Sequence, residues 1–224
     1  MANNKMLLFE QVKSYAEGYM NDTYGAIYGD EFEVIKAGID EITGQNGLVY
    51  MKSRKFENFE IVAKLDKNKL TSSNYLEIYS YESILRPALT EILKEVFDDA
   101  RLSFHYSDVK YLTCDYKWTV EDYLKKEGVA CDIYITESSI NSDDVATYID
   151  KFAEKLILYL NNECACYCRY ISVIICENLP DAEVFTASQF ESRYNKQCHK
   201  KKYRSYRYNE KGKIELVNAS DFVL

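Results

Sequence analysis

Four of the seven cysteines lie within one short segment, "NNECACYCRYISVIIC", which runs from residue 161 to residue 176. Cysteine thiols can bind soft metal ions, form disulfides or act as nucleophiles, and they also pack as small apolar groups. If a strand begins near Cys166, then Cys166, Cys168 and Cys176 share one of its faces, and isoleucine and valine fill the other. We therefore interpret this segment first as a buried strand in which cysteine is an apolar packing residue.

Disulfides between alternate cysteines of such a strand are not expected. Residues two apart on a strand have Cα atoms about 6.5–7 Å apart, at the outer limit of disulfide geometry. Scattered single cysteines in an odd total are typical of a reducing compartment. A catalytic thiol would need a histidine base, and the chain offers only His105 and His199. His199 follows Cys198 directly, so on an extended chain the two side chains point apart.

A soft metal site is the alternative that these thiols leave open. It would combine thiolates from one face of the strand with a cysteine and a histidine nearer the C-terminus. The sequence has no CxxC pair, which is the usual half-site of structural zinc, so we predict no metal. The alternative hypothesis is a thiol- or metal-dependent protein that uses Cys164, Cys166, Cys168, Cys198 and His199.

Other catalytic patterns are missing from the sequence. It contains no GxGxxG, no phosphate-binding P-loop, no HExxH and no GxSxG. The acidic pairs Asp98/Asp99 and Asp143/Asp144 fall at expected helix ends, and the helix dipole explains the second pair. We therefore expect a non-enzymatic protein without a cofactor.

The charge of the chain is unevenly distributed. The net charge is −8, but residues 193 to 213 hold nine Lys or Arg and one acid, which is +8. Subtracting that +8 leaves −16 for the rest of the chain. An acidic body with a basic terminal segment favours either a charged partner or docking of the segment on the body.

Tyrosine is interleaved with the cations of this basic segment. Cations for phosphates and rings for base stacking are the components of a single-strand binder, but a solvated hairpin has the same alternation. The chain has 21 tyrosines, against ten phenylalanines and one tryptophan, and tyrosine is enriched at protein interfaces. We expect a protein partner, with nucleic acid as the less favoured alternative; no oligomeric state is indicated. The predicted contact residues are Lys200, Lys201, Lys202, Tyr203, Arg204, Tyr206, Arg207 and Tyr208.

Hydrophobic periodicity predicts the elements that position these residues. The order is strands and helices without strict alternation, so we predict an α+β fold with mixed or antiparallel sheets packed against helices. Two sub-units are expected, residues 1–98 and 99–224, with a single domain as the alternative. Helices are predicted at 6–20, 74–97 with a break at Pro87, 119–128, 141–163 and after Ser188; strands are predicted at 31–39, 47–53, 59–66, 101–107, 109–116, 129–137 and 166–177, with a terminal hairpin at 202–217.

No apolar run approaches the length of a membrane span, and the patch at residues 6 to 9 is too short for a signal-peptide core. We expect a cytoplasmic protein, with a secreted or lipid-anchored protein as the alternative if a leader has been removed.

Several segments resemble a group of uncharacterised Gram-positive proteins. These segments are "SYAEGYMNDTYGAIYGDEFEVI", "SSNYLEIYSYESILRPALTEILKEVF" and "VEDYLKKEG", and the similarity in pattern covers residues 10 to 177. Many proteins of that group resemble secreted or lipid-anchored proteins, whereas this chain has no lipobox. The resemblance implies a shared fold and carries over no catalytic residue.

Overall fold

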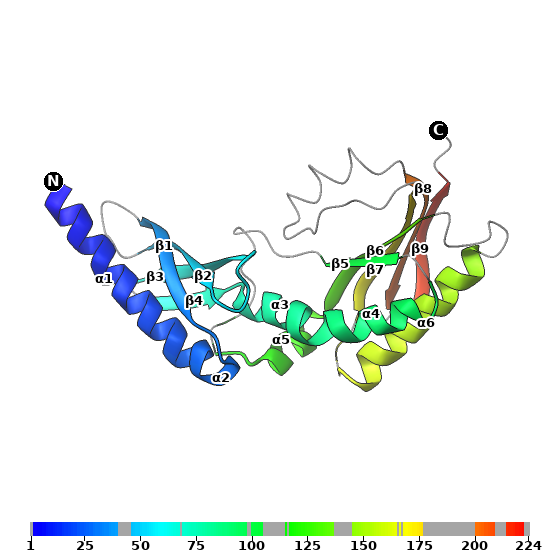
Figure 1. Cartoon of the computed structure of the whole chain (residues 1–224), viewed down its shortest axis with the longest axis horizontal. Coiled ribbons are helices and arrows are strands. Elements are labelled where there is room, and N and C mark those ends of the chain that lie inside the picture. The colour runs from blue at the N-terminus through cyan, green and yellow to red at the C-terminus, as the bar shows by residue number, and fades with distance from the viewer. Residues whose placement is uncertain are drawn as a thin grey trace. The chain divides into compact units, whose positions relative to one another are not determined.

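The chain divides into two compact units in the computed structural model (Figure 1). Unit 1 comprises Met1–Ile78 and Val109–Trp118, and unit 2 comprises Tyr79–Asp108 and Thr119–Leu224. The structure describes residues 2–39, 46–67, 69–97, 100–104, 115, 117–136, 145–164, 166, 168–176, 200–208 and 214–221. Among them, no helix combines the length and the apolar character that crossing a bilayer requires.

The division differs from the predicted joint near residue 98. The chain leaves unit 1 between Ile78 and Tyr79, inside a helical stretch, and residues 109 to 118 return to unit 1. Helical periodicity continues across this point, so the sequence carries no local sign of a boundary there.

Unit 1 is an antiparallel sheet with a helical segment along one face. The sheet has the strand order β1-β2-β3-β4. The helical segment ends where Gly29 adopts a left-handed conformation (φ 66°), and not at residue 20, where we predicted its end. Its elements are α1 (Ala2–Met20), the π-helical η1 (Asn21–Gly25), α2 (Ala26–Tyr28), β1 (Phe32–Ile39), β2 (Gly47–Ser53), β3 (Glu60–Asp66), β4 (Lys69–Ser73) and the start of α3 (Tyr75–Tyr79).

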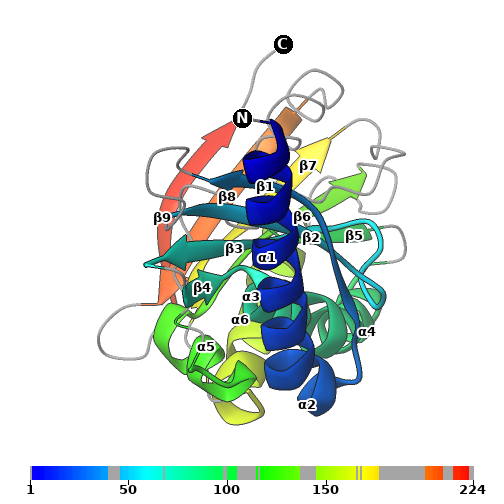
Figure 2. The same cartoon turned by 90° about the vertical axis from the view of Figure 1, so that its left-hand side faces the viewer.

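Figure 2 shows α1 lying across the four strands of unit 1. Val12, Ala16, Met20 and Tyr24 recur at every fourth position and are all buried, so one stripe of the helix faces the sheet. The strands contribute alternate residues to the same layer, as the period of a half-buried strand requires. The buried strand residues include Phe32, Val34, Val49, Met51, Ile61, Ala63 and Leu65.

Helical side chains also cover the outer edge of β1. Phe32 donates its backbone N–H to Asn21 Oδ1 (2.9 Å), and its carbonyl accepts a hydrogen bond from Asn21 Nδ2 (3.4 Å). Val34 donates its N–H to Glu17 Oε1 at 2.8 Å. An uncovered edge strand would present these groups to another chain, so Asn21 and Glu17 block edge-to-edge pairing at this point.

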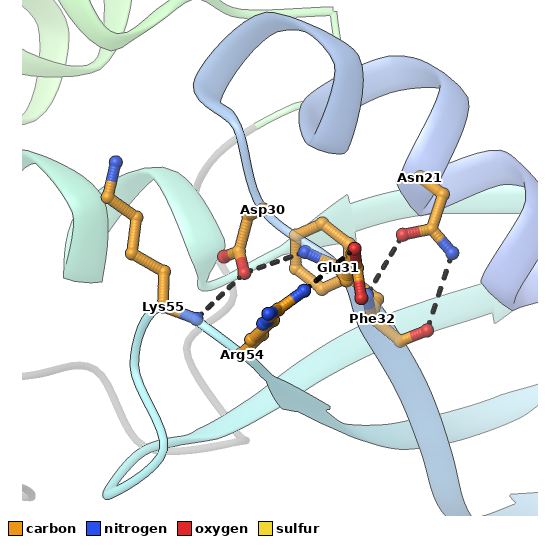
Figure 3. A network of polar contacts seen from close by, with 6 residues as sticks. All are labelled: Asn21, Asp30, Glu31, Phe32, Arg54 and Lys55. Carbon is orange, nitrogen blue, oxygen red and sulfur yellow. Dashed lines mark hydrogen bonds and ion pairs between the residues drawn. The ribbon is translucent and has the colours of Figure 1, made fainter.

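A buried carboxylate fixes the turn that leads into β1 (Figure 3). Asp30 Oδ1 accepts the backbone N–H groups of Glu31 (2.8 Å) and Lys55 (2.9 Å). Its Oδ2 accepts the hydroxyl of Ser53 at 2.6 Å, and that hydroxyl in turn accepts the N–H of Phe56 at 3.0 Å. The network joins the helical segment to the end of β2.

Unit 2 is a five-stranded mixed sheet with the order β5-β6-β7-β8-β9. β6 and β7 pair in parallel, and the other neighbours are antiparallel. The parallel pair is connected through α6, as a crossover connection requires. The elements are η2 (Ser80–Leu85), α4 (Arg86–Lys94), β5 (Ala100–Phe104), α5 (Val120–Glu127), β6 (Val129–Thr136), α6 (Val145–Asn162), β7 (Cys168–Cys176), β8 (Lys200–Tyr208) and β9 (Ile214–Asp221).

The helices η2, α4 and α6 pack on one face of this sheet (Figure 1). Phe104 of β5 contacts the Tyr81 ring with a centroid distance of 4.8 Å, and the Arg86 guanidinium lies 5.0 Å from the centre of the Phe104 ring. Arg86 binds both carboxylate oxygens of Glu82 at 2.7 Å and donates to the Leu102 carbonyl at 2.9 Å. The face that carries Phe104 is therefore the helix-covered face.

The predicted α+β class is confirmed, with one antiparallel and one mixed sheet packed against helices. The short capped helix is confirmed, because Thr119 and Asp122 form a capping box at the start of α5. Pro87 stands in the first turn of α4, as expected for a proline that begins a helix. β8 and β9 form the predicted terminal antiparallel pair.

Two local predictions were wrong. β4 was not predicted, because its sequence "KLTSS" has a single large apolar residue. The cysteine-rich strand begins at Cys168 and not near Cys166. The predictions that lie outside the described residues concern Asp98, Asp99, His105, residues 109–114, the start of the helix predicted at 141–163 with its pair Asp143/Asp144, and the helix after Ser188.

We predict that Asp30→Ala lowers the free energy of unfolding by about 2–4 kcal/mol, because it leaves two backbone N–H groups and one hydroxyl without their acceptor. Chemical denaturation checks this. The control is Asp66→Ala, which removes an exposed carboxylate at the end of β3 and should change stability by less than about 0.5 kcal/mol. Equal effects of the two substitutions would contradict the role given to Asp30.

Candidate functional site

Cys164 and Cys166 lie in the turn that joins α6 to β7, and not in the strand. Two backbone hydrogen bonds hold this turn against the end of α6, from Glu163 N to Tyr159 O (2.9 Å) and from Cys166 N to Leu160 O (3.0 Å). Cys166 is buried, while Cys164 is half-buried, and neither forms a disulfide. The objection to a disulfide between them, which assumed strand geometry, therefore does not apply.

The environment of Cys164 favours its thiolate. A hydrogen bond from the Cys166 thiol and a second from the Tyr159 hydroxyl lower the pKa of Cys164 to about 7, although partial burial and the charge of Glu163 oppose this. Burial, and then the same contact with Cys164, raises the pKa of Tyr159 to about 12. Tyr159 therefore remains a hydrogen-bond donor at every pH at which the thiol titrates.

The structure does not describe the other sulfur and imidazole groups of the predicted site. Cys168 is the first residue of β7, and nothing is described of its side chain. Cys198 and His199 lie outside the described residues. Within the described part of the chain, no group of three or more histidine, cysteine or acidic side chains could hold a metal ion.

The predicted contact residues all belong to β8, which is an inner strand of the sheet of unit 2. Its register with β7 places Lys202 opposite Ile175, Arg204 opposite Val173 and Tyr206 opposite Ile171. The same three apolar residues of β7 also have apolar neighbours on their other side, so each belongs to a row that crosses the sheet from β5. The rows are Ala100–Ile135–Ile175, Leu102–Ile133–Val173 and Phe104–Cys131–Ile171. Residues opposite each other share a face, so three apolar rows of the helix-covered face end at β7 and continue as Lys202, Arg204 and Tyr206.

The register of β8 with β9 places acids opposite two of its cations. Arg207 stands opposite Glu215, and Lys202 stands opposite Asp221. Arg204 stands opposite Ala219, so its cross-strand position offers no countercharge on either side. Opposite charges at such positions stabilise a strand pair. Pairing between β8 and β9 is therefore a sufficient reason for Arg207 and Lys202. Within the described strand pairs, three cations of β8 remain without an acid opposite them, Lys200 and Lys201 at its start and Arg204 at its centre.

The second face of the sheet carries a row of polar residues that the sequence did not reveal. Ser103, Asp132, Ser172, Ser205 and Asn218 stand opposite one another on the five successive strands. The first three are buried, and the hydroxyl of Ser103 has no hydrogen-bond partner among the described residues. Each of these residues is a polar position within its own strand and is visible in the sequence. Their alignment depends on the pairing of strands that are far apart in the sequence, which no local pattern reveals.

Comparisons with known proteins assign neither a family nor an activity to the chain. No family model matches the chain, and no curated protein matches it. A crystal structure of a DUF5037 family protein from Ruminococcus gnavus resembles it with a TM-score of 0.47 and 12% sequence identity, over 91% of this chain and 94% of that chain.

We predict that alkylation of Cys164 by iodoacetamide reaches half its maximal rate near pH 7, because only the thiolate reacts and its fraction grows as the pH rises through the lowered pKa. Peptide mass spectrometry after timed labelling measures the rate at each cysteine. An ordinary thiol has its midpoint near about pH 8.5.

Two substitutions on α6 test the cause of the lowered pKa. Tyr159→Phe removes a hydrogen bond to the thiolate and should move the midpoint to higher pH. Tyr148→Phe removes a hydroxyl from an exposed tyrosine of the same helix and should leave the midpoint unchanged. A midpoint near about pH 8.5 in the unmodified protein would refute the assigned environment.

Proposed function

We propose that this protein is a non-enzymatic binding protein that contacts an acidic segment of a protein partner through β8. The observation that carries the proposal is the register of β8, which continues three apolar rows of the sheet as Lys202, Arg204 and Tyr206. A sheet that only needed to complete its core would continue these rows with apolar residues. Cations and a phenol at those positions favour recognition of an anionic surface.

The spacing of these positions suits an extended acidic peptide. Alternate residues of a strand lie about 6.5–7 Å apart, and alternate carboxylates of an extended partner have the same spacing. On the face that continues the three apolar rows, Lys202 and Arg204 supply the charge, and Tyr206 and Tyr208 supply contact area of low conformational entropy. Lys202 and Arg207 each have an acidic residue opposite them on β9, whereas Arg204 stands opposite Ala219. We therefore take Arg204 as the central cation of the proposed surface.

Nucleic acid is the alternative partner, and the charge of the chain disfavours it. Domains that bind nucleic acid usually carry a net positive charge, whereas this chain has a net charge of −8. We place the proposed binding activity in the cytoplasm, because single cysteines scattered along the chain in an odd total of seven are typical of a reducing compartment.

We predict that the whole chain binds a fluorescent alternating Glu-Thr peptide of about twelve residues more tightly than a thymidine oligonucleotide of similar length, as measured by fluorescence anisotropy. Binding should weaken as salt rises from about 50 mM to about 500 mM, since exposed charges are then screened. Arg204→Glu should weaken peptide binding at least about tenfold, because it removes one attraction and adds one repulsion.

The matched control is Lys64→Glu, which makes the same charge change at an exposed strand residue of unit 1. It should alter peptide binding by less than about twofold. Equal losses in the two variants would show a general effect of net charge and would overturn the assignment of the surface to β8. Tighter binding of the oligonucleotide would favour the alternative partner.

A further inference from the structure

The α6–β7 turn holds two thiols whose accessibility differs. Cys164 is half-buried, whereas Cys166 is only 3% exposed. The thiol of Cys166 donates a hydrogen bond to the sulfur of Cys164, and the Tyr159 hydroxyl donates another. An oxidant from solution therefore reaches Cys164 first, and Cys166 is already positioned beside it.

We propose that Cys164 and Cys166 form a redox-active dithiol, in which Cys164 reacts with a hydroperoxide and Cys166 then closes a disulfide with it. This site is separate from the binding surface proposed on β8. Hydrogen bonds that favour the Cys164 thiolate give it the form that attacks peroxides. Burial of Cys166 keeps the resolving thiol from reacting directly.

The chemistry requires two steps and one oxidant. In the first step the Cys164 thiolate attacks one oxygen of the peroxide, an S–O bond forms, the O–O bond breaks, and the leaving hydroxide takes up a proton to become water. In the second step the sulfur of Cys166 attacks the sulfenic sulfur of Cys164, an S–S bond forms and the S–O bond breaks. The hydroxide that leaves takes the proton of Cys166. Two thiols are thus oxidised to one disulfide while hydrogen peroxide is reduced to two waters.

The position of the pair in a turn is what makes ring closure acceptable. On an extended strand, residues two apart are separated by about 6.5–7 Å at Cα, which strains a disulfide. The hydrogen bond from Cys166 N to Leu160 O folds this segment back on α6, and the two thiols are within hydrogen-bonding reach. Cys164 is partly exposed, and a disulfide that a reductant can reach is more easily reduced, which suits a reversible switch.

The test treats the reduced whole chain with hydrogen peroxide, blocks the remaining thiols with N-ethylmaleimide and maps each cysteine by peptide mass spectrometry. We expect a pair of thiols to be lost together, in the peptide that contains Cys164 and Cys166. Cys131 is fully buried in β6, and it should remain reduced as an internal reference. In Cys166→Ser the reaction should stop at a dimedone-reactive sulfenic acid on Cys164, and in Cys164→Ser the thiol of Cys166 should remain reduced.

The matched control is Cys168→Ser, which removes the next cysteine in the sequence and should leave the disulfide intact. Circular dichroism before oxidation establishes that each variant is folded. A disulfide that disappears in Cys168→Ser but persists in Cys166→Ser would overturn the assignment of the resolving thiol. Equal oxidation rates at Cys164 and at free cysteine, with no disulfide, would overturn the proposal as a whole. Peptide binding by the Cys164→Ser variant separates this result from the function proposed for β8.

Discussion

The parallel pairing of β6 with β7 is the constraint on which the rest of unit 2 depends. Two adjacent strands run in the same direction only if the chain is carried back to the end of the sheet where the first strand began. α6 makes that return, so its last residues and the turn after it must lie at the starting end of β7. The thiol turn is the direct consequence, because the chain has to leave α6, reverse and enter β7 within a few residues. The same pairing sets the register from which β8 and β9 are built outward.

The polar row is unusual because it crosses β6, a strand that is buried on both faces. All eight residues of β6 are buried, as is typical of a parallel strand at the centre of a sheet. Such strands are normally almost continuously apolar, yet β6 carries Asp132 between two apolar neighbours. A carboxylate in that position requires polar surroundings, and the residues opposite it on the two adjacent strands, Ser103 and Ser172, are both polar, although the Ser103 hydroxyl forms no hydrogen bond among the described residues. On the helix-covered face, the described residues of β6 include no charged side chain. One face of this strand is therefore apolar, and the other carries a buried carboxylate.

Local patterns predicted the elements, whereas long-range register decided what the candidate sites contain. Thr119 and Asp122 predicted a helix start because a capping box is complete within four residues. The π-helical residues from Asn21 to Gly25 were interpreted as a break, since glycine and turn formers have the same local signature whether or not the helix continues. The importance of Tyr159 was missed because its position on α6 fits the apolar stripe; only the turn after α6 brings Cys164 back to it. The row through Asp132 joins strands far apart in sequence, and no local pattern reports such an alignment.

The two proposed activities share β7, and packing keeps them separate. A disulfide between Cys164 and Cys166 would constrain the connection into β7. One possible consequence is a shift in the register of β7, which would also change the register of β8. A slip by one residue would move Ile171, Val173 and Ile175 from the helix-covered face to the polar face. Such a slip would place these three side chains against the polar row and would bring Ser172 into the apolar layer under the helices, so both faces of the sheet oppose it. We therefore expect that a disulfide in the turn would leave the register of Lys202, Arg204 and Tyr206 unchanged.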